Sequence, residues 1–259
     1  MTGEPVRTDS PESVWFWSHY EEAANDTLEF LGGDGIALEG RRVADVGCGD
    51  GMIDLGLTHR GRPAELVGYD LNPVDQGHLL RVAGEAGVAD AIPPELRFEI
   101  SGVGTLPAPD ASFDVVLTWS AFEHVAEPIS LLGEMRRIMK DDGVLFLQLW
   151  PFFHSARGSH LWDWFDDYVN LMRTEDEIVA EMRERPFQSA GWTEYMIDEY
   201  RHLNRIDVDE LQRSLLAAGL AVRKFELITH TVRITTELQR YPLSKLGISG
   251  VKLLATKLA

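Results

Sequence analysis

Residues 43–51 join an apolar run to a cluster of glycines, and this junction constrains the fold more than any other stretch. The run ends at Val46, and three glycines follow at alternate positions, Gly47, Gly49 and Gly51. Such a run predicts a buried strand, and the glycines predict a turn whose backbone closely approaches a ligand or another part of the chain. Residues 52–60 are compatible with a helix that has Gly61 as its C-cap. A strand, a glycine turn and a helix in this order open nucleotide-binding α/β folds.

The order of the glycines separates two classes of ligand. Dinucleotide-binding turns need a small residue at the sixth position from the first glycine, where Met52 stands here. A nicotinamide-dependent oxidoreductase is therefore the least favoured function. The pattern G-x-G-x-G behind a strand that carries Asp45 instead resembles motif I of the class I S-adenosylmethionine-dependent methyltransferases. A glycine turn that serves no ligand is the alternative.

A second acidic residue lies where an adenosine cofactor needs one. Residues 64–70 form another short apolar run, which ends at Asp70, 19 residues beyond Gly51. A carboxylate at the end of this strand accepts hydrogen bonds from ribose hydroxyls. Asp70 alone could be a cap, but its spacing after the glycine turn favours the ribose. Asn72 and Pro73 are typical of the N-cap and first residue of a helix.

Further strands are predicted at residues 96–100, 110–117, 144–149, 220–229 and 251–257, with a turn at 141–143 before the third of these. The segments SFDVV (112–116) and SAFEHV (120–125) resemble the fourth strand of the methyltransferase family and the segment after it. Asp207 and Glu210 form a capping box for a helix that ends at Gly219. The resemblance covers residues 43–149 and 206–259. It implies one α/β domain over residues 1–259: a Rossmann-like, seven-stranded, mostly parallel sheet with helices on both faces and an antiparallel last strand.

The resemblance also implies the cofactor, S-adenosylmethionine, and the residues that contact it. Relatives usually carry an acid after the third strand for the adenine, but residues 101–107 contain none. Backbone groups of Gly102 and Val103 could serve the adenine edge instead, since each offers a donor and an acceptor. The expected cofactor-binding residues are Tyr20, Asp45, Gly47, Cys48, Gly49, Gly51, Asp70, Leu71, Gly102, Val103 and Trp119.

One connection, residues 151–205, is much longer than the others and rich in aromatic residues. A compact domain rarely contains so long a connection without structure or function. Residues 166–185 have helical spacing, so we expect a helical insertion after the fifth strand that forms a lid and pocket wall. The N-terminal aromatic residues 15–20 should flank the same pocket, although packing in the core is the alternative for each ring.

Three histidines are candidates for the chemistry. Histidine is the natural base near neutral pH, and His124 follows the fourth strand, although Glu123 and His124 could simply brace their loop. His154 and His160 follow the fifth strand, in a polar loop that opens into the insertion. We expect this loop to belong to the acceptor site and the Glu123–His124 pair to be mainly a brace. His160 and Asp163 are one helical turn apart, but no H-E-x-x-H spacing occurs, and no metal site is predicted.

Composition limits the partners. The chain has 259 residues and a net charge of −18, which repels nucleic-acid phosphates and anionic lipids, and there is no lysine–arginine run. Its single cysteine excludes a disulfide within the chain and suggests the cytoplasm. Neither a secretory leader nor a membrane span is predicted. We therefore expect a methyltransferase that acts on a small molecule, with oxygen favoured over nitrogen and carbon as the methyl acceptor. A cofactor-binding regulatory or scaffold protein without transfer activity is the alternative, and the oligomeric state stays open.

Overall fold

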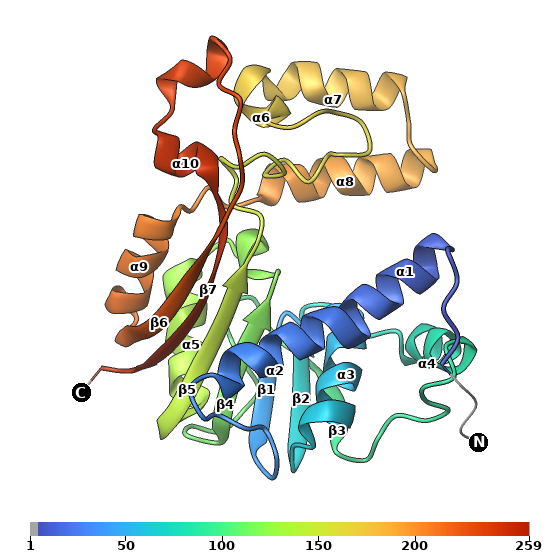
Figure 1. Cartoon of the computed structure of the whole chain (residues 1–259), viewed down its shortest axis with the longest axis vertical. Coiled ribbons are helices and arrows are strands. Elements are labelled where there is room, and N and C mark those ends of the chain that lie inside the picture. The colour runs from blue at the N-terminus through green and yellow to red at the C-terminus, as the bar shows by residue number, and fades with distance from the viewer. Residues whose placement is uncertain (1–4, 259) are drawn as a thin grey trace.

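The sheet has the predicted architecture. The computed structural model describes residues 5–258, and in this part of the chain seven strands are arranged in the order β3-β2-β1-β4-β5-β7-β6 (Figure 1). Neighbouring strands are parallel except for β7, which is antiparallel to both β5 and β6. The strands are β1 (Arg42–Val46), β2 (Glu65–Asp70), β3 (Leu96–Ile100), β4 (Phe113–Trp119), β5 (Met139–Leu149), β6 (Leu220–Thr229) and β7 (Ile248–Lys257).

The starts of three strands differ from the prediction by three residues or more. Strand β7 starts at Ile248 rather than at residue 251. Strand β4 starts at Phe113 rather than at residue 110. Strand β5 starts at Met139, so the turn predicted at residues 141–143 lies inside the strand. Phe113 pairs with Met139, whereas Val115 already pairs with Val144, so the extra residues of β5 form a bulge. The turn-forming residues are therefore accommodated without ending the strand.

The helices are α1 (Pro11–Trp17), α2 (Ala24–Gly32), α3 (Met52–Gly61), α4 (Gln76–Glu85), α5 (Pro128–Ile138), α6 (Val169–Met172), α7 (Glu175–Glu184), α8 (Ala190–His202), α9 (Val208–Ala217) and α10 (Leu243–Gly247). A π-helical segment, Ser18–Ala23, joins α1 to α2. The capping box of α9 is confirmed. The predicted start of α4 is wrong, because Asp75 caps it by accepting from the His78 N–H. Gly61 is the last residue of α3, and Arg62 adopts the left-handed conformation beyond it.

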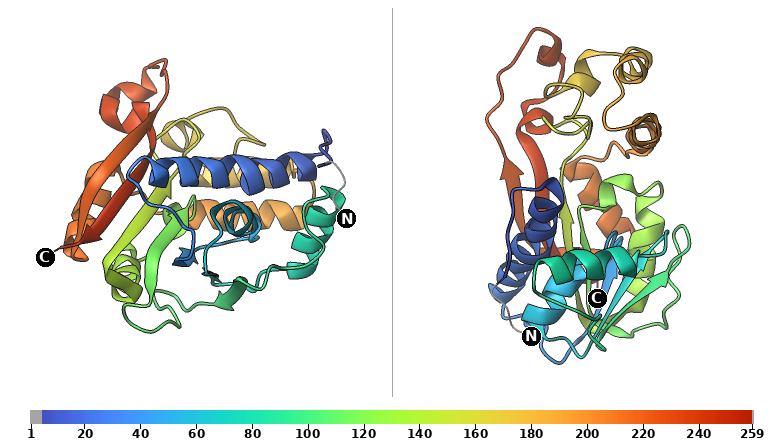
Figure 2. Two further views of the ribbon diagram at one scale, coloured as in Figure 1. Left: turned by 60° about the horizontal axis from the view of Figure 1, so that its bottom comes forward. Right: turned by 90° about the vertical axis from the view of Figure 1, so that its right-hand side faces the viewer.

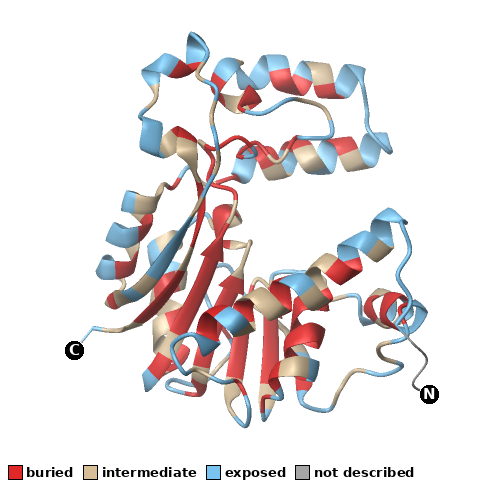
Figure 3. Cartoon of the chain, in the orientation of Figure 1, coloured by how far each residue is buried: buried red, intermediate tan, exposed pale blue. Residues whose placement is uncertain are grey.

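Alternate strand residues contribute to two separate cores. Val43 faces a core formed with α1 to α4 and the segment between α1 and α2. Ala44 faces the opposite core, which α5 and α9 cover. Figure 2 shows these helices on the two sides of the sheet, and Figure 3 shows the central strands buried along their length.

A helical lobe lies beyond the carboxyl-terminal ends of β4 and β5 (Figure 1). The predicted insertion, residues 151–205, supplies α6, α7 and α8, and the helical spacing at 166–185 is split by Thr174, which caps α7. The connection between β6 and β7, which contains α10, completes the lobe and was not anticipated. Tyr168 joins the two parts: its hydroxyl lies 2.7 Å from His230 Nε2 and donates to the Leu246 carbonyl (3.0 Å). The lobe therefore has its own core. No helix among residues 5–258 is long and apolar enough to cross a membrane.

Candidate active site

In the glycine turn after β1, a side chain would clash at two of the three glycines and would meet no neighbouring atom at the third. All three glycines have positive φ: 84° at Gly47, 56° at Gly49 and 76° at Gly51. A Cβ on Gly47 would lie 2.5 Å from Ala121 Cβ, and one on Gly51 would lie 2.6 Å from the Phe98 ring. A Cβ on Gly49 would meet nothing within 4 Å. Gly49 therefore marks the side of the turn that a ligand can approach.

Asp70 holds this turn from the neighbouring strand. Its Oδ2 accepts a hydrogen bond from the Gly49 N–H (3.0 Å), and its Oδ1 accepts one from the Asn72 N–H (3.0 Å). A carboxylate has about four acceptor positions, so two remain for ribose hydroxyls. Asp70 is thus a cap in this structure and keeps the capacity of a ligand. Leu71, next to it, is exposed.

Asp45 and Cys48 lie beneath the turn rather than on its open side. Asp45 is buried against Asp54 of α3. Burial raises the pKa of both carboxyls, and the neighbouring Asp45 raises that of Asp54 further. Burial also raises the pKa of the Cys48 thiol, which keeps it protonated and unreactive. The side chains of these expected cofactor residues therefore shape the turn from below.

The N-terminal helices present aromatic residues on two faces. On the outer face, Trp15 Nε1 donates to Asp50 of the glycine turn (2.7 Å), and the His19 ring lies 4.0 Å from Trp15 and 5.5 Å from Trp119. Trp119 thus lies beside His19, and its expected contact with the cofactor stays a prediction. Trp15 and His19 were not among the expected cofactor residues; their signal in the sequence was the i,i+4 spacing of two rings.

Tyr20 belongs to the inner face. It is 6% exposed, its ring is stacked on Phe16 at 5.0 Å, and its hydroxyl lies 3.0 Å from His59 Nδ1 of α3. The alternative of core packing thus describes Tyr20 better than a cofactor contact does.

In the loop after β3, some of the backbone groups expected to contact the adenine are already hydrogen-bonded within the loop. The Gly102 N–H donates to the Thr105 carbonyl (3.0 Å), and the Gly102 carbonyl accepts from the Thr105 N–H (3.2 Å). Val103 is 74% exposed at the tip of this loop. Of the two residues proposed for the adenine edge, Val103 is the more available.

The segment after β4 carries Glu123 and His124 from the glycine turn toward the lobe. Ala121 packs against Gly47, and a 3₁₀-helix, Phe122–His124, follows. Asn204 braces it: its N–H donates to the Glu123 carbonyl (2.8 Å) and its Nδ2 to the Phe122 carbonyl (2.7 Å). Asn204 thus braces the backbone of this segment, and the brace expected from the Glu123 and His124 side chains stays a prediction.

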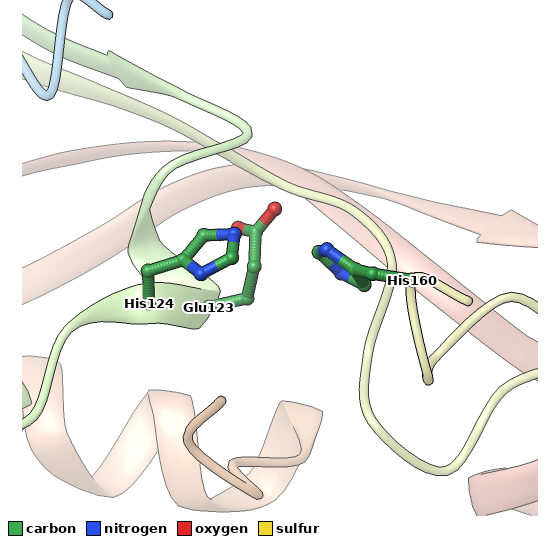
Figure 4. Close-up of side chains that lie close together, drawn as sticks. All are labelled: Glu123, His124 and His160. Atoms are coloured by element: carbon green, nitrogen blue, oxygen red, sulfur yellow. The ribbon is translucent and has the colours of Figure 1, made fainter. Parts of the chain in front are cut away.

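His160 and Glu199 join them from the lobe. The rings of His124 and His160 are 5.1 Å apart, and Glu199 Oε2 of α8 lies 3.1 Å from His124 Nδ1. Figure 4 shows the two imidazoles and the Glu123 carboxylate gathered together. We call Glu123, His124, His160 and Glu199 the histidine–glutamate cluster. It combines residues from three distant segments at the end of the sheet where the cofactor is expected.

Burial sets the protonation of this cluster. It raises the pKa of Glu123 to about 7 and lowers that of His160 to about 3, so the His160 imidazole is neutral at physiological pH. Burial alone would lower the pKa of His124 as well, but the Glu199 and Glu123 carboxylates outweigh it, and the net shift is upward. The pKa of Glu199 is lowered by its hydrogen bond with His124.

His154 does not join the cluster. Its ring lies 5.5 Å from Phe153 and 6.1 Å from Tyr241, and it lines a separate cavity of about 140 Å³ with Asp207 and Lys245. The structure thus separates the two ends of the loop that we expected to act together.

Comparisons with known proteins agree with the fold and the turn. The model of a family described as "Methyltransferase domain" matches residues 16–224. The ubiquinone biosynthesis O-methyltransferase of Hahella chejuensis is 27% identical over 208 residues, which cover 73% of this chain and 81% of that protein. The protein of the same name from Paracidovorax citrulli is 36% identical over 119 residues, 44% of this chain and 45% of that one.

A solved structure has the same fold. Geranyl diphosphate C-methyltransferase from Streptomyces coelicolor A3(2), in complex with Mg²⁺, geranyl diphosphate and S-adenosyl-L-homocysteine, has a TM-score of 0.57 and 15% sequence identity, with 99% of this chain and 87% of that chain covered. Together with the open glycine turn and the sheet order, the family match over most of the chain leads to one conclusion. The chain belongs to the methyltransferase-domain family and is a class I S-adenosylmethionine-dependent methyltransferase.

Proposed function

We propose that this enzyme methylates a hydroxyl oxygen of a small aromatic molecule that binds at the histidine–glutamate cluster. The observation that carries the proposal is the packing of Ala121 against Gly47. It ties the segment that bears Glu123 and His124 to the turn expected to hold the cofactor. The O-methyltransferase names of the relatives support transfer to oxygen. They do not favour the alternative of a scaffold without activity.

Aromatic side chains lie beside two members of the polar cluster. Trp162 is 43% exposed, and its ring lies 5.8 Å from that of His160. On α8, Trp192 and Tyr195 are stacked at 5.3 Å, and Glu199 follows one turn later on the same face. Flat apolar surfaces around a few polar groups are typical of small-molecule sites. They favour an acceptor with an aromatic body and a hydroxyl group, as a phenol has.

The position of the helical lobe suits a role in controlling access to this site. Residues 151–205 contribute His160 and Glu199 to the cluster. The connection between β6 and β7 packs against this insertion, where His230 contacts Tyr168. We infer that the lobe is the lid and pocket wall of the acceptor site. Exclusion of water there strengthens electrostatic interactions during methyl transfer.

The proposed reaction is an in-line displacement at the methyl carbon. The acceptor oxygen forms a bond to that carbon, the carbon–sulfur bond breaks, and its electron pair returns to sulfur. The hydroxyl proton is released to water. The cofactor supplies the electrophile and the leaving group, so the protein contributes mainly the approach geometry, which is worth about 7–11 kcal/mol when well oriented.

Labelled cofactor tests this proposal directly. The full chain is incubated with methyl-labelled S-adenosylmethionine and matched sets of phenols, anilines and benzoates. We expect a labelled methyl ether and S-adenosylhomocysteine in equal amounts. Label found only on nitrogen, on carbon or on a carboxylate would contradict the choice of acceptor.

A pair of histidine variants tests the location. His124→Ala should lower the transfer rate by about a hundredfold, as misplaced reacting groups do, and keep its affinity for S-adenosylhomocysteine. His154→Ala, which changes the separate cavity, should retain the rate. The reverse pattern would move the acceptor to the cavity lined by Asp207 and Lys245.

A further inference from the structure

Three members of the histidine–glutamate cluster have the composition of a metal site. Glu123, His124 and His160 each offer one ligand atom, and these atoms all lie within 4.8 Å of one another (Figure 4). Zinc bonds to imidazole and carboxylate are about 2.0–2.2 Å long, so two ligands in tetrahedral geometry lie about 3.4 Å apart. Side-chain rotations that shorten the longest separation by about 1–1.5 Å would bring all three atoms to bonding distance.

Two of these side chains have a buried polar atom that lacks a hydrogen-bond partner in the described chain. Glu123 is 4% exposed and its Oε2 has no partner; His160 is half-buried and its buried Nε2 has none either. An unsatisfied buried polar group costs about 1–3 kcal/mol, and more when it is charged. Such groups require an explanation, and an ion is a common one. A cation between Glu123 and His160 would satisfy both atoms at once.

The surrounding contacts hold the three residues in place. Asn204 fixes the backbone of Glu123, and Glu199 lies beside Nδ1 of His124, which leaves Nε2 for a ligand. A carboxylate on the far nitrogen is the usual outer contact of a metal-bound histidine. His160 has a positive φ of 61°, an unfavourable conformation for a residue with a side chain, which is common at functional sites.

We propose that Glu123, His124 and His160 bind a divalent transition-metal cation of the zinc class, with a remaining position for the acceptor's hydroxyl oxygen. Two nitrogen donors and one carboxylate favour such cations over Mg²⁺ and Ca²⁺, which prefer oxygen. A bound cation would lower the pKa of the acceptor hydroxyl and orient it. The role in activation rests on the proposed O-methylation, whereas metal binding itself does not.

Cobalt(II) is the probe for the site, because its visible spectrum reports its ligands. The full chain is stripped with a chelator and titrated with Co²⁺, and Zn²⁺ binding is then measured by calorimetry. We expect one cation per chain, with nitrogen ligation in the spectrum. Glu123→Gln and His160→Ala should each weaken binding at least tenfold, the effect of losing one metal-site contact.

His154→Ala is the matched control, since it removes a histidine from the same loop outside the cluster, and it should bind Co²⁺ as the parent does. Affinity for S-adenosylhomocysteine shows that each variant is folded. Absence of Co²⁺ binding in a parent chain that binds S-adenosylhomocysteine would overturn the proposal, as would equal binding by His160→Ala.

Activity distinguishes this inference from the proposed function. Ether formation that is lost on stripping and restored by Zn²⁺ supports both. Full activity of the stripped enzyme would overturn the cation's role and leave O-methylation standing. Tight, cluster-dependent binding without transfer to any hydroxyl would support the metal site and contradict the proposed acceptor.

Discussion

Alanine substitutions at Gly49 and Gly51 distinguish a ligand-binding position from a packing position in one turn. Both residues have positive φ, so alanine costs about 1–2 kcal/mol of folding free energy at either position. The surroundings differ: nothing lies within 4 Å of a Cβ on Gly49, whereas the Phe98 ring lies 2.6 Å from one on Gly51. Overpacking of this kind adds about 1–3 kcal/mol.

We therefore expect Gly49→Ala to lower the free energy of unfolding by about 1–2 kcal/mol and Gly51→Ala by about 2–5 kcal/mol. The effects on cofactor binding should run the other way. The new methyl group at Gly49 would occupy the open side of the turn, so S-adenosylmethionine should bind at least about tenfold more weakly, or about 1.4 kcal/mol. Folded Gly51→Ala should keep its affinity within about threefold, well under 1 kcal/mol.

Urea unfolding and calorimetric titration of both variants measure the two quantities. The unfolding slope must stay constant for the stabilities to be compared. Unchanged cofactor affinity in Gly49→Ala would refute the assignment of the open side to the cofactor. A larger loss of stability at Gly49 than at Gly51 would refute the packing argument.

Three other substitutions probe the turn and its surroundings. Asp70→Ala should weaken S-adenosylmethionine binding by about 1.5–3 kcal/mol, the value of a hydrogen bond to a charged group; less than a threefold change in calorimetry would make it only a cap. Asn204→Ala removes the amide that donates to the Phe122 and Val125 carbonyls after β4, and should lower the free energy of unfolding in urea by about 1–3 kcal/mol. A stability equal to the parent's would contradict this. Burial raises the pKa of Asp45 and Asp54 above the unfolded value near 4, so their contribution to stability is present below that value and is lost as pH rises through the folded pKa. Asp54→Asn should therefore melt higher than the parent near pH 7 and lose this advantage toward pH 4; a constant difference between the two melting curves across this range would contradict the shifted pKa.

Local signals predicted the fold where they agreed with the tertiary packing. The strands 96–100 and 220–229 and the capping box at Asp207 appear at their predicted positions. The signal at Asn72 and Pro73 failed because the chain runs on to Asp75, which caps α4 instead. The aromatic N-terminal segment was ambiguous for another reason: rings at i,i+4 occur on two faces of the same helix. Only packing against α3 decides that Tyr20 is buried and that Trp15 and His19 border the glycine turn.

The candidate site was partly visible in the sequence. Gly49 and His124 follow strands, and Asp70 is the last residue of one, so the topology of the sheet brings all three to the carboxyl ends of its strands. The pairing of His124 with His160 and Glu199 depends on how the lobe folds back, which no local pattern reports. The contribution of the β6–β7 connection to the lobe is equally non-local, and it shows only in contacts such as that of Tyr168 with His230.

We infer that the transferable methyl group lies at the histidine–glutamate cluster when the cofactor occupies the glycine turn. Isotope-filtered NMR of the enzyme with S-[methyl-¹³C]adenosylmethionine detects which side chains lie near this methyl group. We predict nuclear Overhauser effects from the labelled methyl to the imidazole protons of His124 and His160, with the His160 signals assigned through His160→Ala. A bound cofactor whose methyl contacts neither ring, and instead contacts His154 or Tyr20, would contradict the account.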